Sequence, residues 1–498
     1  METEALLKWK ASLLNDSPSL LPTWTISNSS SYFNKTTTPC KWFGISCNNA
    51  GNVVKLNVSS LGLQGTLLNF KFSSFPYLTT LDLSSNALFG TILASLGNLS
   101  DLTTLYLSRN QLSGSIPPEI GNLKSLESLV LYTNTLTSSI PASLGNLNYL
   151  TTLYLFKNQL FGSIPPEIGN LKSIVDLEIN TNILNGTIHA SLGNLSDLTN
   201  LDLWKNQLSG SIPPEIGNLK SLKSMALSNN ILSGTIPASL GNLSDLTTLY
   251  LYKNQLSGSI PPEIENLKSL VDLEISTNNL SDTIPASIGN LSDLTTLYLF
   301  ENQLSGNLSD LTTLYLFENQ LSGSIPPEIR NLKYLVDLQI CTNNLRGTIP
   351  ASLVNLSDLT ILYLFKNQLY GSIPPEIGNL KSLENLALYI NTLTGSIPTS
   401  LDNLSDLAIW YLLQNQLSGS IPPEIGNLKS LENLALSINS LTGSIPVSLG
   451  NLSDLTILFL YENHLSGSIP PHIENMTNLK RLLMKYNSYE PISIAFPS

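Results

Sequence analysis

A 24-residue unit recurs along most of the chain and constrains the fold more than any other feature. Residues 102–123 read LTTLYLSRNQLSGSIPPEIGNL, and versions of this stretch continue from residue 56 almost to the C-terminus. Repeats of this length are typical of solenoids, in which one unit cannot bury its apolar side and neighbouring units stack into a continuous core. We therefore expect one elongated stack from the 498 residues rather than several globular domains.

Each unit begins with the pattern L-x-x-L-x-L-x-x-N. The alternation is typical of a short strand with leucines inward and the intervening residues outward. The asparagine amide can hydrogen-bond the backbone of neighbouring turns, so we expect an asparagine ladder through the stack. Leu61 holds the ladder position in a degenerate first unit, and the later positions are Asn86, Asn110, Asn134, Asn158, Asn182, Asn206, Asn230, Asn254, Asn278, Asn302, Asn319, Asn343, Asn367, Asn391, Asn415, Asn439, Asn463 and Asn487.

The second half of each unit, S-G-S-I-P-P-E-I-G-N-L, predicts the opposite side of the stack. Its glycines and prolines exclude a long regular helix and favour tight turns with one helical turn. Strands on one side and compact turns on the other would curve the stack, with the strands on the concave face. The predicted fold is an α/β solenoid, a right-handed leucine-rich-repeat superhelix of about 19 repeats over residues 51–487.

One repeat is shorter than the others. Residues 290–306 and 307–323 are the same 17 residues twice, so a short repeat falls at 303–319. Leucine-rich repeats usually have about 20 to 29 residues. We expect the strand to stay in register here and the outer wall to be pinched near Gly306.

Residues 1–50 differ from the repeats and predict a helical N-terminal cap. A helix can open at Thr3, and its apolar stripe is Ala5, Leu6, Trp9, Leu13 and Leu14. A shorter helix is expected over residues 18–24. A bridge between Cys40 and Cys47 would close a small loop over the exposed edge of the first repeat. Residues 488–498 form a predicted tail without a second cysteine pair.

Composition excludes several functions. Thirty-six acidic residues against 24 basic ones give a net charge of −12, which argues against nucleic acid as a partner. No stretch supplies the roughly 18 apolar residues of a membrane helix.

His189, His464 and His472 are scattered, so no metal or cofactor is expected. No nucleophile–base pair stands out, so the chain is not expected to be an enzyme. Cys341 stands alone and is interpreted as a bystander.

A close cysteine pair and many glycosylation sequons indicate an extracellular protein. No signal peptide precedes METEALLKWK, and we interpret this start as a trimmed end with an added methionine. The predicted glycosylation sites are Asn28, Asn34, Asn57, Asn98, Asn185, Asn194, Asn242, Asn290, Asn355, Asn403, Asn451 and Asn475.

The outward positions of the strands form rows of aromatic and charged residues. Aromatic rings flanked by charged groups suit a peptide-binding groove. The alternative is that the aromatics stack on one another only to stabilise the strands. The predicted ligand-binding residues on the concave face are Tyr154, Phe156, Lys157, Asp176, Glu178, Trp204, Lys205, Tyr250, Tyr252, Lys253, Asp272, Glu274, Tyr298 and Phe300.

The repeat motif LxxLxLxxNxLxGxIPxxIGNL, with the cap segments ALLKWKASLLNDSPSLLPTWT and CKWFGISC, resembles plant leucine-rich-repeat receptor-like kinases. The likeness extends to the subgroup of male-discoverer-interacting, peptide-sensing kinases. The resemblance implies an extracellular module that binds a secreted peptide or protein on its concave face, with a co-receptor kinase near the C-terminal repeats. The chain carries no kinase, membrane span or C-terminal cysteine cap, and no Arg-x-Arg pair for a peptide carboxylate.

Two other functions stay open from the sequence. One is a secreted inhibitor of microbial wall-degrading enzymes, which similar plant repeat proteins resemble. The other is an ice- or cell-wall-binding protein that uses a regular array of Thr, Ser and Asn.

Overall fold

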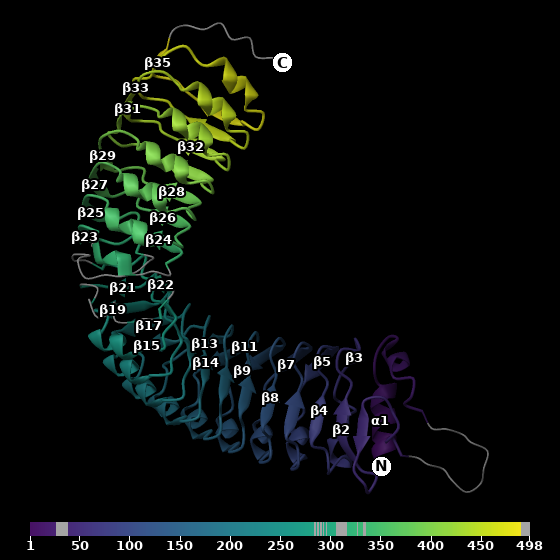
Figure 1. The fold of residues 1–498 in the computed structure, drawn as a ribbon. Helices are drawn as coiled ribbons and strands as arrows, with labels where there is room; N and C mark the ends of the chain where they lie inside the picture. The colour runs from purple at the N-terminus through teal and green to yellow at the C-terminus, as the bar shows by residue number, and fades with distance from the viewer. Residues whose placement is uncertain are drawn as a thin grey trace. The chain divides into compact units, whose positions relative to one another are not determined.

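The chain packs into two units, which we describe separately (Figure 1). Unit 1 consists of Met1–Leu256 and Asn266–Leu270, and unit 2 consists of Ser257–Glu265 and Val271–Ser498. The computed structural model describes residues 1–25, 38–282, 285, 288, 291, 293–294, 296–304, 316–325, 327–331 and 335–489. The predicted pinch near Gly306 and most of the short repeat lie outside these residues.

The N-terminal residues of unit 1 form the expected helical cap. Helix α1 (Glu2–Ala11) is followed by the 3-10 helix η1 (Ser17–Leu20), and Cys40 and Cys47 form a disulfide. Trp9 is fully buried, and its indole N–H donates to the Thr66 carbonyl at 3.0 Å. The prediction for Leu14 is wrong: α1 ends at Ala11, and the Leu14 side chain is 47% exposed.

The long sheet of unit 1 supplies one strand per repeat. The first strand, β1 (Ile45–Cys47), pairs antiparallel with β2 (Val53–Asn57), and the following strands are parallel to β2 in sequence order. Each parallel strand pairs with the same position one repeat later, as in Thr104↔Ser128. The parallel strands after β2 are β4 (Thr80–Asp82), β6 (Thr104–Tyr106), β8 (Ser128–Val130), β10 (Thr152–Tyr154), β12 (Asp176–Glu178), β14 (Asn200–Asp202), β16 (Ser224–Ala226) and β18 (Thr248–Tyr250).

The rest of each repeat forms a second row of short strands and then a 3-10 helix. The 3-10 helices confirm the predicted single helical turns, whereas the second strand row was not predicted. The strands in unit 1 are β3 (Gln64–Gly65), β5 (Ala87–Thr91), β7 (Gln111–Gly114), β9 (Thr135–Ser138), β11 (Gln159–Gly162), β13 (Ile183–Leu184), β15 (Ser209–Gly210) and β17 (Ile231–Gly234). The helices are η2 (Phe72–Ser74), η3 (Ala94–Asn98), η4 (Pro118–Asn122), η5 (Ala142–Asn146), η6 (Pro166–Asn170), η7 (Ala190–Asn194), η8 (Pro214–Asn218) and η9 (Ala238–Asn242). The division between the units falls, along the sequence, within β19 (Gln255–Gly258) and η10 (Pro262–Asn266).

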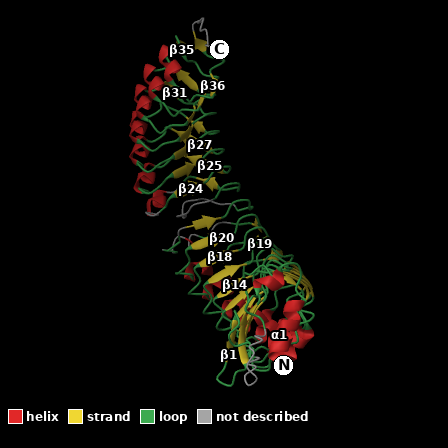
Figure 2. Cartoon of the chain, turned by 90° about the vertical axis from the view of Figure 1, so that its right-hand side faces the viewer, coloured by secondary structure: helices red, strands yellow, loops and turns green. Residues whose placement is uncertain are grey.

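Unit 2 repeats this architecture. Figure 2 shows its helices on one side of the stack and its long-sheet strands on the other. Its long-sheet strands fall in two groups: β20 (Asp272–Glu274) pairs with β22 (Thr296–Tyr298), and a separate seven-stranded sheet contains β24 (Asp337–Gln339), β26 (Ile361–Tyr363), β28 (Asn385–Ala387), β30 (Ile409–Tyr411), β32 (Asn433–Ala435), β34 (Ile457–Phe459) and β36 (Arg481–Leu483). The second row contains β21 (Asn279–Leu280), β23 (Ser322–Gly323), β25 (Asn344–Gly347), β27 (Gln368–Gly371), β29 (Thr392–Leu393), β31 (Ser418–Ser420), β33 (Ser440–Thr442), β35 (Ser466–Gly467) and β37 (Ser488–Tyr489). The helices are η13 (Pro327–Asn331), η14 (Ala351–Asn355), η15 (Pro375–Asn379), η16 (Thr399–Asn403), η17 (Pro423–Asn427), η18 (Val447–Asn451) and η19 (Pro471–Asn475).

The predicted asparagine ladder is confirmed in both units. The Asn110 carboxamide oxygen accepts from the Leu88 amide at 3.0 Å. Its nitrogen donates to the carbonyls of Leu83 and Leu107 at 3.0 and 3.1 Å. These side chains satisfy buried backbone groups of their own turn and of the turn before it, each of which would otherwise cost about 1–3 kcal/mol. Asn319, in the short repeat, is an exception, because its side-chain oxygen is buried without a hydrogen-bond partner among the described residues.

The residue before each ladder asparagine has a left-handed backbone. From Ser85 to Tyr486, these residues have φ between 52° and 60°. This conformation disfavours most L-residues, and the β-branched ones most of all. It turns the chain out of the strand and places a long side chain such as Lys157 at the strand end.

Glycine permits a close approach between successive 3-10 helices of unit 1. A Cβ atom at Gly121 would lie 2.3 Å from the Ser143 carbonyl oxygen of the next repeat. The glycine of E-I-G-N is therefore required by packing between turns. Among the described residues, no helix has the length and hydropathy needed to cross a membrane.

Candidate ligand-binding face

The candidate site lies on the sheet face, which we define as the side chains of the long-sheet strands that point away from the leucine core. On β12, Leu177 is fully buried in the core, whereas Asp176 and Glu178 on either side of it are partly exposed on the sheet face. The same alternation places every predicted residue of β10, β12 and β18 on this face of unit 1.

A network of carboxylates and amides crosses β10, β12 and β14. The Tyr154 hydroxyl donates to Asp176, and the Asn200 amide donates to Asp176 at 2.8 Å and to Glu178 at 3.3 Å. Asn180, which follows β12, donates from its side-chain amide to Asp202 of β14 at 2.6 Å. These bonds hold three carboxyl groups close together on the sheet face.

Burial and mutual repulsion change the acidity of this network. Burial, followed by repulsion from Asp176 and Asp202, raises the pKa of Glu178 to about 7, against a smaller lowering by the bond from Asn200. Burial also raises the pKa of Asp202, although hydrogen bonds from Trp204 and Asn180 oppose it. For Tyr154, burial and the hydrogen bond to Asp176 raise the pKa of the phenol. The charge of this patch therefore varies near neutral pH.

Aromatic rings border the network. Phe156 stacks on Tyr132 with centroids 4.3 Å apart and an interplanar angle of 7°. The Lys205 ammonium lies 5.5 Å from the ring centroid of Trp204. The Trp204 indole nitrogen is buried and has no hydrogen-bond partner within the described part of the chain. Stacked pairs do occur, as the stabilising alternative expects, but the rings remain partly exposed on the sheet face.

Three predicted lysines lie at the ends of alternate strands. Lys157, Lys205 and Lys253 occupy the left-handed position before the ladder asparagine, with φ of 53°, 56° and 53°. All three lysine side chains are exposed. Tyr250 and Tyr252 precede Lys253, with their rings 6.4 Å apart in an edge-on arrangement.

The sequence prediction missed four partners in this region: Tyr132, Asn180, Asn200 and Asp202. The repeat itself contained the signal, because position n pairs with position n+24 in a parallel stack. Asp176 pairs with Asn200, and Glu178 pairs with Asp202. Aligning the repeats by register would have placed these residues beside the predicted ones.

The remaining predicted residues lie in unit 2. Asp272 and Glu274 are on β20, in register with Thr296 and Tyr298 on β22. The Tyr298 and Phe300 rings are 6.1 Å apart, and Phe300 stacks on Phe317 at 4.2 Å. They form an aromatic and acidic group on unit 2's own sheet face.

Cys341 follows β24 and has no disulfide partner. Its side chain is buried, and burial raises the pKa of its thiol to about 12. A protonated buried thiol behaves as a small apolar side chain.

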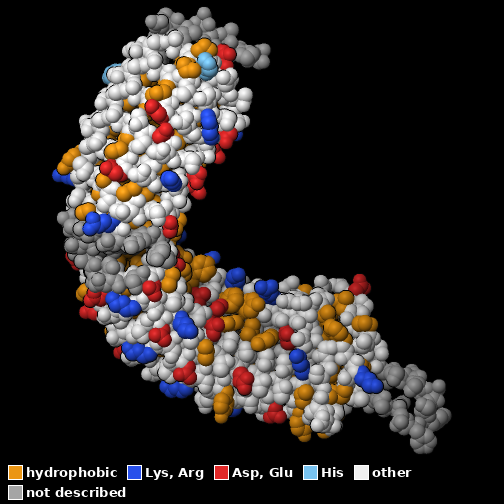
Figure 3. All heavy atoms as spheres, in the orientation of Figure 1, with side chains coloured by type: hydrophobic (Ala, Val, Ile, Leu, Met, Phe, Trp, Pro, Cys, Tyr) orange, Lys and Arg blue, Asp and Glu red, His pale blue; other side chains and the backbone are white. Residues whose placement is uncertain are grey.

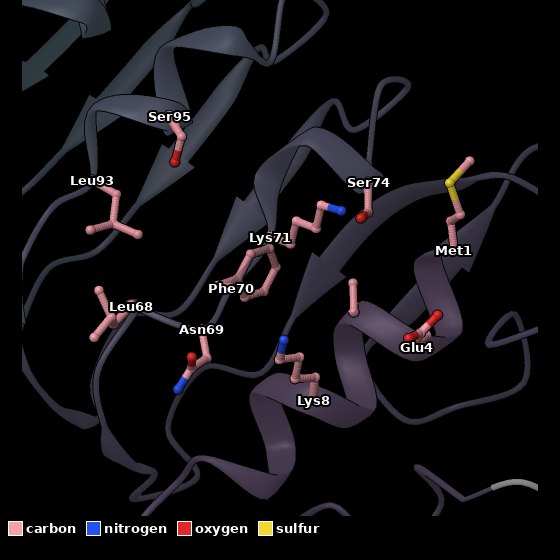
Figure 4. A pocket seen from close by; sticks show the side chains of 11 residues that line it. Met1, Glu4, Lys8, Leu68, Asn69, Phe70, Lys71, Ser74, Leu93 and Ser95 are labelled. Atoms are coloured by element: carbon pink, nitrogen blue, oxygen red, sulfur yellow. The ribbon is translucent and has the colours of Figure 1, made fainter.

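A shallow hollow of about 400 Å³ lies at the N-terminal edge of unit 1 (Figure 4). Glu4 and Lys8 of α1 face Leu68, Asn69 and Lys71 across it. Its charged groups make no constellation for catalysis. Over the visible surface of each unit, charged and hydrophobic side chains are interspersed among uncharged polar ones (Figure 3).

The predicted glycosylation asparagines are mostly exposed. Asn57 is partly buried, with its side-chain oxygen accepting from Ser59, and Asn28, Asn34 and Asn290 lie outside the described residues. The exposed ones are Asn98, Asn185, Asn194, Asn242, Asn355, Asn403, Asn451 and Asn475.

The sequence matches three leucine-rich-repeat families. The family described as leucine-rich repeat region matches residues 58–210 and 189–308, and the leucine rich repeat N-terminal domain matches residues 1–48. The leucine rich repeat family matches residues 310–332, 358–380 and 454–476.

Similar curated proteins are receptor kinases of Arabidopsis thaliana. The chain is 40% identical to MDIS1-interacting receptor like kinase 2 over 102 residues, which are 20% of this chain and 9% of that protein. It is 45% identical over 98 residues to the probable leucine-rich repeat receptor-like protein kinase At1g35710, again 20% of this chain and 8% of that protein. The chain thus aligns with under a tenth of the length of either kinase.

Solved structures give longer matches. The plant peptide hormone receptor RGFR1, solved in complex with RGF2, is 40% identical with a TM-score of 0.85, over 90% of this chain and 72% of that one. The Arabidopsis receptor kinase HAESA, solved with the peptide hormone IDA and the co-receptor SERK1, is 32% identical with a TM-score of 0.70, over 98% of this chain and 94% of that one. The chain belongs to the leucine-rich-repeat family and is homologous to the ectodomains of plant leucine-rich-repeat receptor-like kinases.

Proposed function

We propose that the chain is the ligand-recognition module of an extracellular plant receptor and binds a secreted peptide or protein on the sheet face of unit 1. The observation that carries the proposal is the group on β10 to β18, where aromatic rings, lysine ammonium groups and a hydrogen-bonded carboxylate network lie on one face. RGFR1, which shares this fold, was solved with a peptide hormone.

Each kind of side chain has a proposed role. Tyr154, Phe156, Trp204, Tyr250 and Tyr252 offer partly exposed rings against apolar ligand side chains, where aromatic anchors contribute most to affinity. Asp176 and Glu178 accept hydrogen bonds from ligand N–H or basic groups, and Lys157, Lys205 and Lys253 pair with ligand carboxylates. On the face of unit 2, Asp272, Glu274, Tyr298 and Phe300 are proposed to contribute in the same ways.

The proposed setting is the outer side of the plasma membrane or the apoplast. The Cys40–Cys47 disulfide and the exposed sequons support it, and we propose that those asparagines carry glycans. A co-receptor kinase is the proposed second partner near the C-terminal repeats, by analogy with the HAESA complex that contains SERK1. Recognition without catalysis is proposed for this chain.

The matches to peptide-hormone receptors favour this proposal over a secreted inhibitor of wall-degrading enzymes or an ice- or wall-binding protein. Inhibition of a polygalacturonase at micromolar chain concentration, without peptide capture, would instead favour the inhibitor function.

The test is peptide capture from an apoplastic extract, with bound peptides identified by mass spectrometry. The variant Tyr250→Ala/Tyr252→Ala/Lys253→Ala should lose at least about tenfold in recovery of the captured peptides. The matched control, Tyr106→Ala/Arg109→Ala, removes side chains from the same rows outside the proposed window and should retain capture. Equal recovery by the triple variant, or no peptide recovered by the wild type, would contradict the proposal.

A further inference from the structure

Two exposed apolar side chains lie side by side on the second strand row of unit 1. Phe161 on β11 and Ile183 on β13 are direct partners in the parallel pairing of these strands. Their side chains are 51% and 46% exposed, whereas Leu160 and Leu184, which adjoin them in the sequence, are fully buried in the core. The alternation along each strand therefore turns Phe161 and Ile183 outward together, and we call this pair the Phe161–Ile183 patch.

The patch is a local departure from the other repeats. Exposed large apolar side chains also occur in this row at Phe89, Ile231 and Tyr370. Their register partners are polar, namely Gln111, Ser209 and Thr392. Within the described part of the row, the patch alone joins two exposed large apolar side chains. Single exposed apolar residues are ordinary on a surface, whereas contiguous ones mark places that another group covers.

A glycosylation sequon begins directly after β13. Residues 185–187 read Asn-Gly-Thr, and the side chains of Asn185 and Thr187 are both exposed. Asn185 lies two positions after Ile183, with the buried Leu184 between them. Because successive side chains point to opposite sides, Asn185 and Ile183 face the same way.

A backbone hydrogen bond fixes Asn185 beside β11 as well. The Asn185 amide donates to the carbonyl of Gly162, the residue after Phe161, at 2.9 Å. A strand spacing of about 4.8 Å and a two-residue advance of about 6.8 Å place Asn185 roughly 7 Å from Ile183 and roughly 8 Å from Phe161. The first sugar of a glycan begins beyond the end of the asparagine side chain, so it is within reach of both apolar groups.

The chemistry of that first sugar fits the patch. Glycosylation joins the Asn185 side-chain nitrogen to carbon 1 of N-acetylglucosamine. The donor is an oligosaccharide on a lipid diphosphate, which leaves as the free lipid diphosphate with the amide proton. The pyranose ring carries hydroxyl groups around its edge and C–H groups on its faces. Such a face packs on the negative face of an aromatic ring, which Phe161 offers, and on an aliphatic side chain, which Ile183 offers.

We propose that a glycan on Asn185 packs its first N-acetylglucosamine ring on the Phe161–Ile183 patch and stabilises β11 and β13. The Asn185 glycan is then a structural part of unit 1. The sequon at Asn242 has a different setting, because the Lys220 ammonium donates to the Asn242 carbonyl at 3.0 Å at the end of η9. This inference rests on the proposed function, because glycans are added only on the secretory route.

The test uses the full chain from cells whose glycans stay high-mannose. Glycopeptide mass spectrometry measures the occupancy of Asn185, and hydrogen exchange is followed on a peptide that covers β11 and contains no sequon. Asn185→Gln should exchange there at least about threefold faster than the wild type, because the sugar ring no longer covers Phe161. The matched control Asn242→Gln removes a glycan from η9 and should leave β11 unchanged. An unoccupied Asn185, or equal exchange in Asn185→Gln and wild type, would overturn the proposal.

Phe161→Ser tests whether the glycan acts through the patch. Serine is the residue at this position in other repeats, such as Ser113 and Ser209. In the Phe161→Ser background, Asn185→Gln should no longer accelerate exchange of β11. An equal acceleration with and without Phe161 would contradict the proposed contact. Wild type and Asn185→Gln from a bacterial host without glycosylation should exchange alike, and a difference between them would assign the effect to the side chain instead.

Enzymatic trimming of the folded protein gives the same test without a substitution. Endoglycosidase H leaves the first N-acetylglucosamine on each asparagine, whereas PNGase F removes the whole glycan. The chain treated with endoglycosidase H should keep the slow exchange of β11, and the chain treated with PNGase F should show the threefold acceleration. Loss of protection after endoglycosidase H would mean that the first sugar does not cover the patch.

These outcomes are distinct from those that test ligand recognition. Asn185 follows a strand of the second row, whereas the proposed ligand-binding residues lie on the sheet face, so Asn185→Gln should retain peptide capture. Capture of peptides with no effect of Asn185→Gln on β11 would overturn only the glycan inference. Protection of β11 by the glycan, together with no peptide captured by the wild type, would overturn only the proposed ligand recognition.

Discussion

The two units present different chemistry on equivalent backbones. At the first position of the strands, unit 1 carries polar residues such as Thr152, Asp176 and Asn200, whereas unit 2 carries Ile361, Ile409 and Ile457 on alternate strands. Buried leucines and ladder asparagines recur in both units. The inward positions therefore specify the scaffold, and the outward positions can change without affecting it.

The outer walls of the units also differ. In unit 1, glycine recurs in every described 3-10 helix of the repeats from Gly97 to Gly241. In unit 2 the same position holds Arg330, Val354, Asp402 and Glu474 in four helices. Because a Cβ atom at the unit 1 glycines would contact the next backbone, turns that carry larger residues must separate locally.

The largest expected effect tests whether the scaffold is equivalent in both units. Asn134→Ala leaves the Leu112 amide and the Leu107 and Leu131 carbonyls without their bonds of 2.9, 3.0 and 3.0 Å. We expect the local free energy of unfolding to fall by about 4 kcal/mol, measured from hydrogen exchange at Leu112. Asn391→Ala in unit 2 should cost as much, and a much smaller loss there would break the equivalence.

A smaller effect tests the difference between the outer walls. A Cβ atom at Gly145 would lie 2.2 Å from the Glu167 carbonyl oxygen, so Gly145→Val should destabilise unit 1 by about 3 kcal/mol in urea unfolding. The reverse change in unit 2, Val354→Gly, should alter stability by about 1 kcal/mol or less, because that turn already accommodates a side chain. Tolerance of Gly145→Val would show that glycine there is not required by packing.

The acidic network should give unit 1 a pH dependence. The pKa of Glu178 is raised from 4.5 to about 7, so the folded state retains a proton that the unfolded state has lost between these values. Stability should therefore fall as pH rises from about 4.5 to 7, by about 1–2 kcal/mol after allowance for the half-exposed carboxyl. Glu178→Gln should flatten the profile of hydrogen exchange on β12. On β24 of unit 2, Gln339 holds the position that Glu178 has on β12. Hydrogen exchange at the backbone amides of β24 should therefore not show this loss of stability as pH rises.

The smallest effect concerns the left-handed residue before the ladder. Ile438 has φ of 56°, whereas Asn229 holds the same position in unit 1 with φ of 60°. Asparagine tolerates this conformation better than a β-branched residue. Ile438→Asn should therefore stabilise unit 2 by about 1 kcal/mol, and Asn229→Ile should destabilise unit 1 similarly, both measured by thermal unfolding. Destabilisation by Ile438→Asn would show that packing of Ile438 outweighs its backbone strain.

The scaffold was largely predictable from the sequence because it depends on contacts that every repeat shares. The 24-residue period predicted the parallel stack, the recurring asparagines predicted the ladder, and Cys40 and Cys47 predicted the disulfide. The left-handed position was not predictable, because Lys157, Thr181 and Ile438 do not favour that backbone and adopt it only under tertiary constraint. The second strand row was missed because S-G-S carries no alternating apolar signal.

The candidate face was predictable only in part. Alternation identified which side chains point outward, but contacts such as Asn200 with Asp176 arise between repeats. They require the register as well as the residue types. Burial of Glu178 within that group, and hence the rise in its pKa, depends on how the neighbouring side chains pack.

The ladder also determines how the molecule responds to tension. Asn110 bonds to backbone groups of its own turn and of the turn before it, and Asn134 repeats the pattern one turn later. A solenoid pulled from its ends should therefore unfold one whole turn at a time, and each turn should unfold only after the hydrogen bonds from the neighbouring ladder asparagine have broken. Each full-length repeat that unfolds frees 24 residues, or about 80 Å of extended chain, whereas the 17-residue repeat at 303–319 frees fewer, so the extension per step should be uniform except at that repeat.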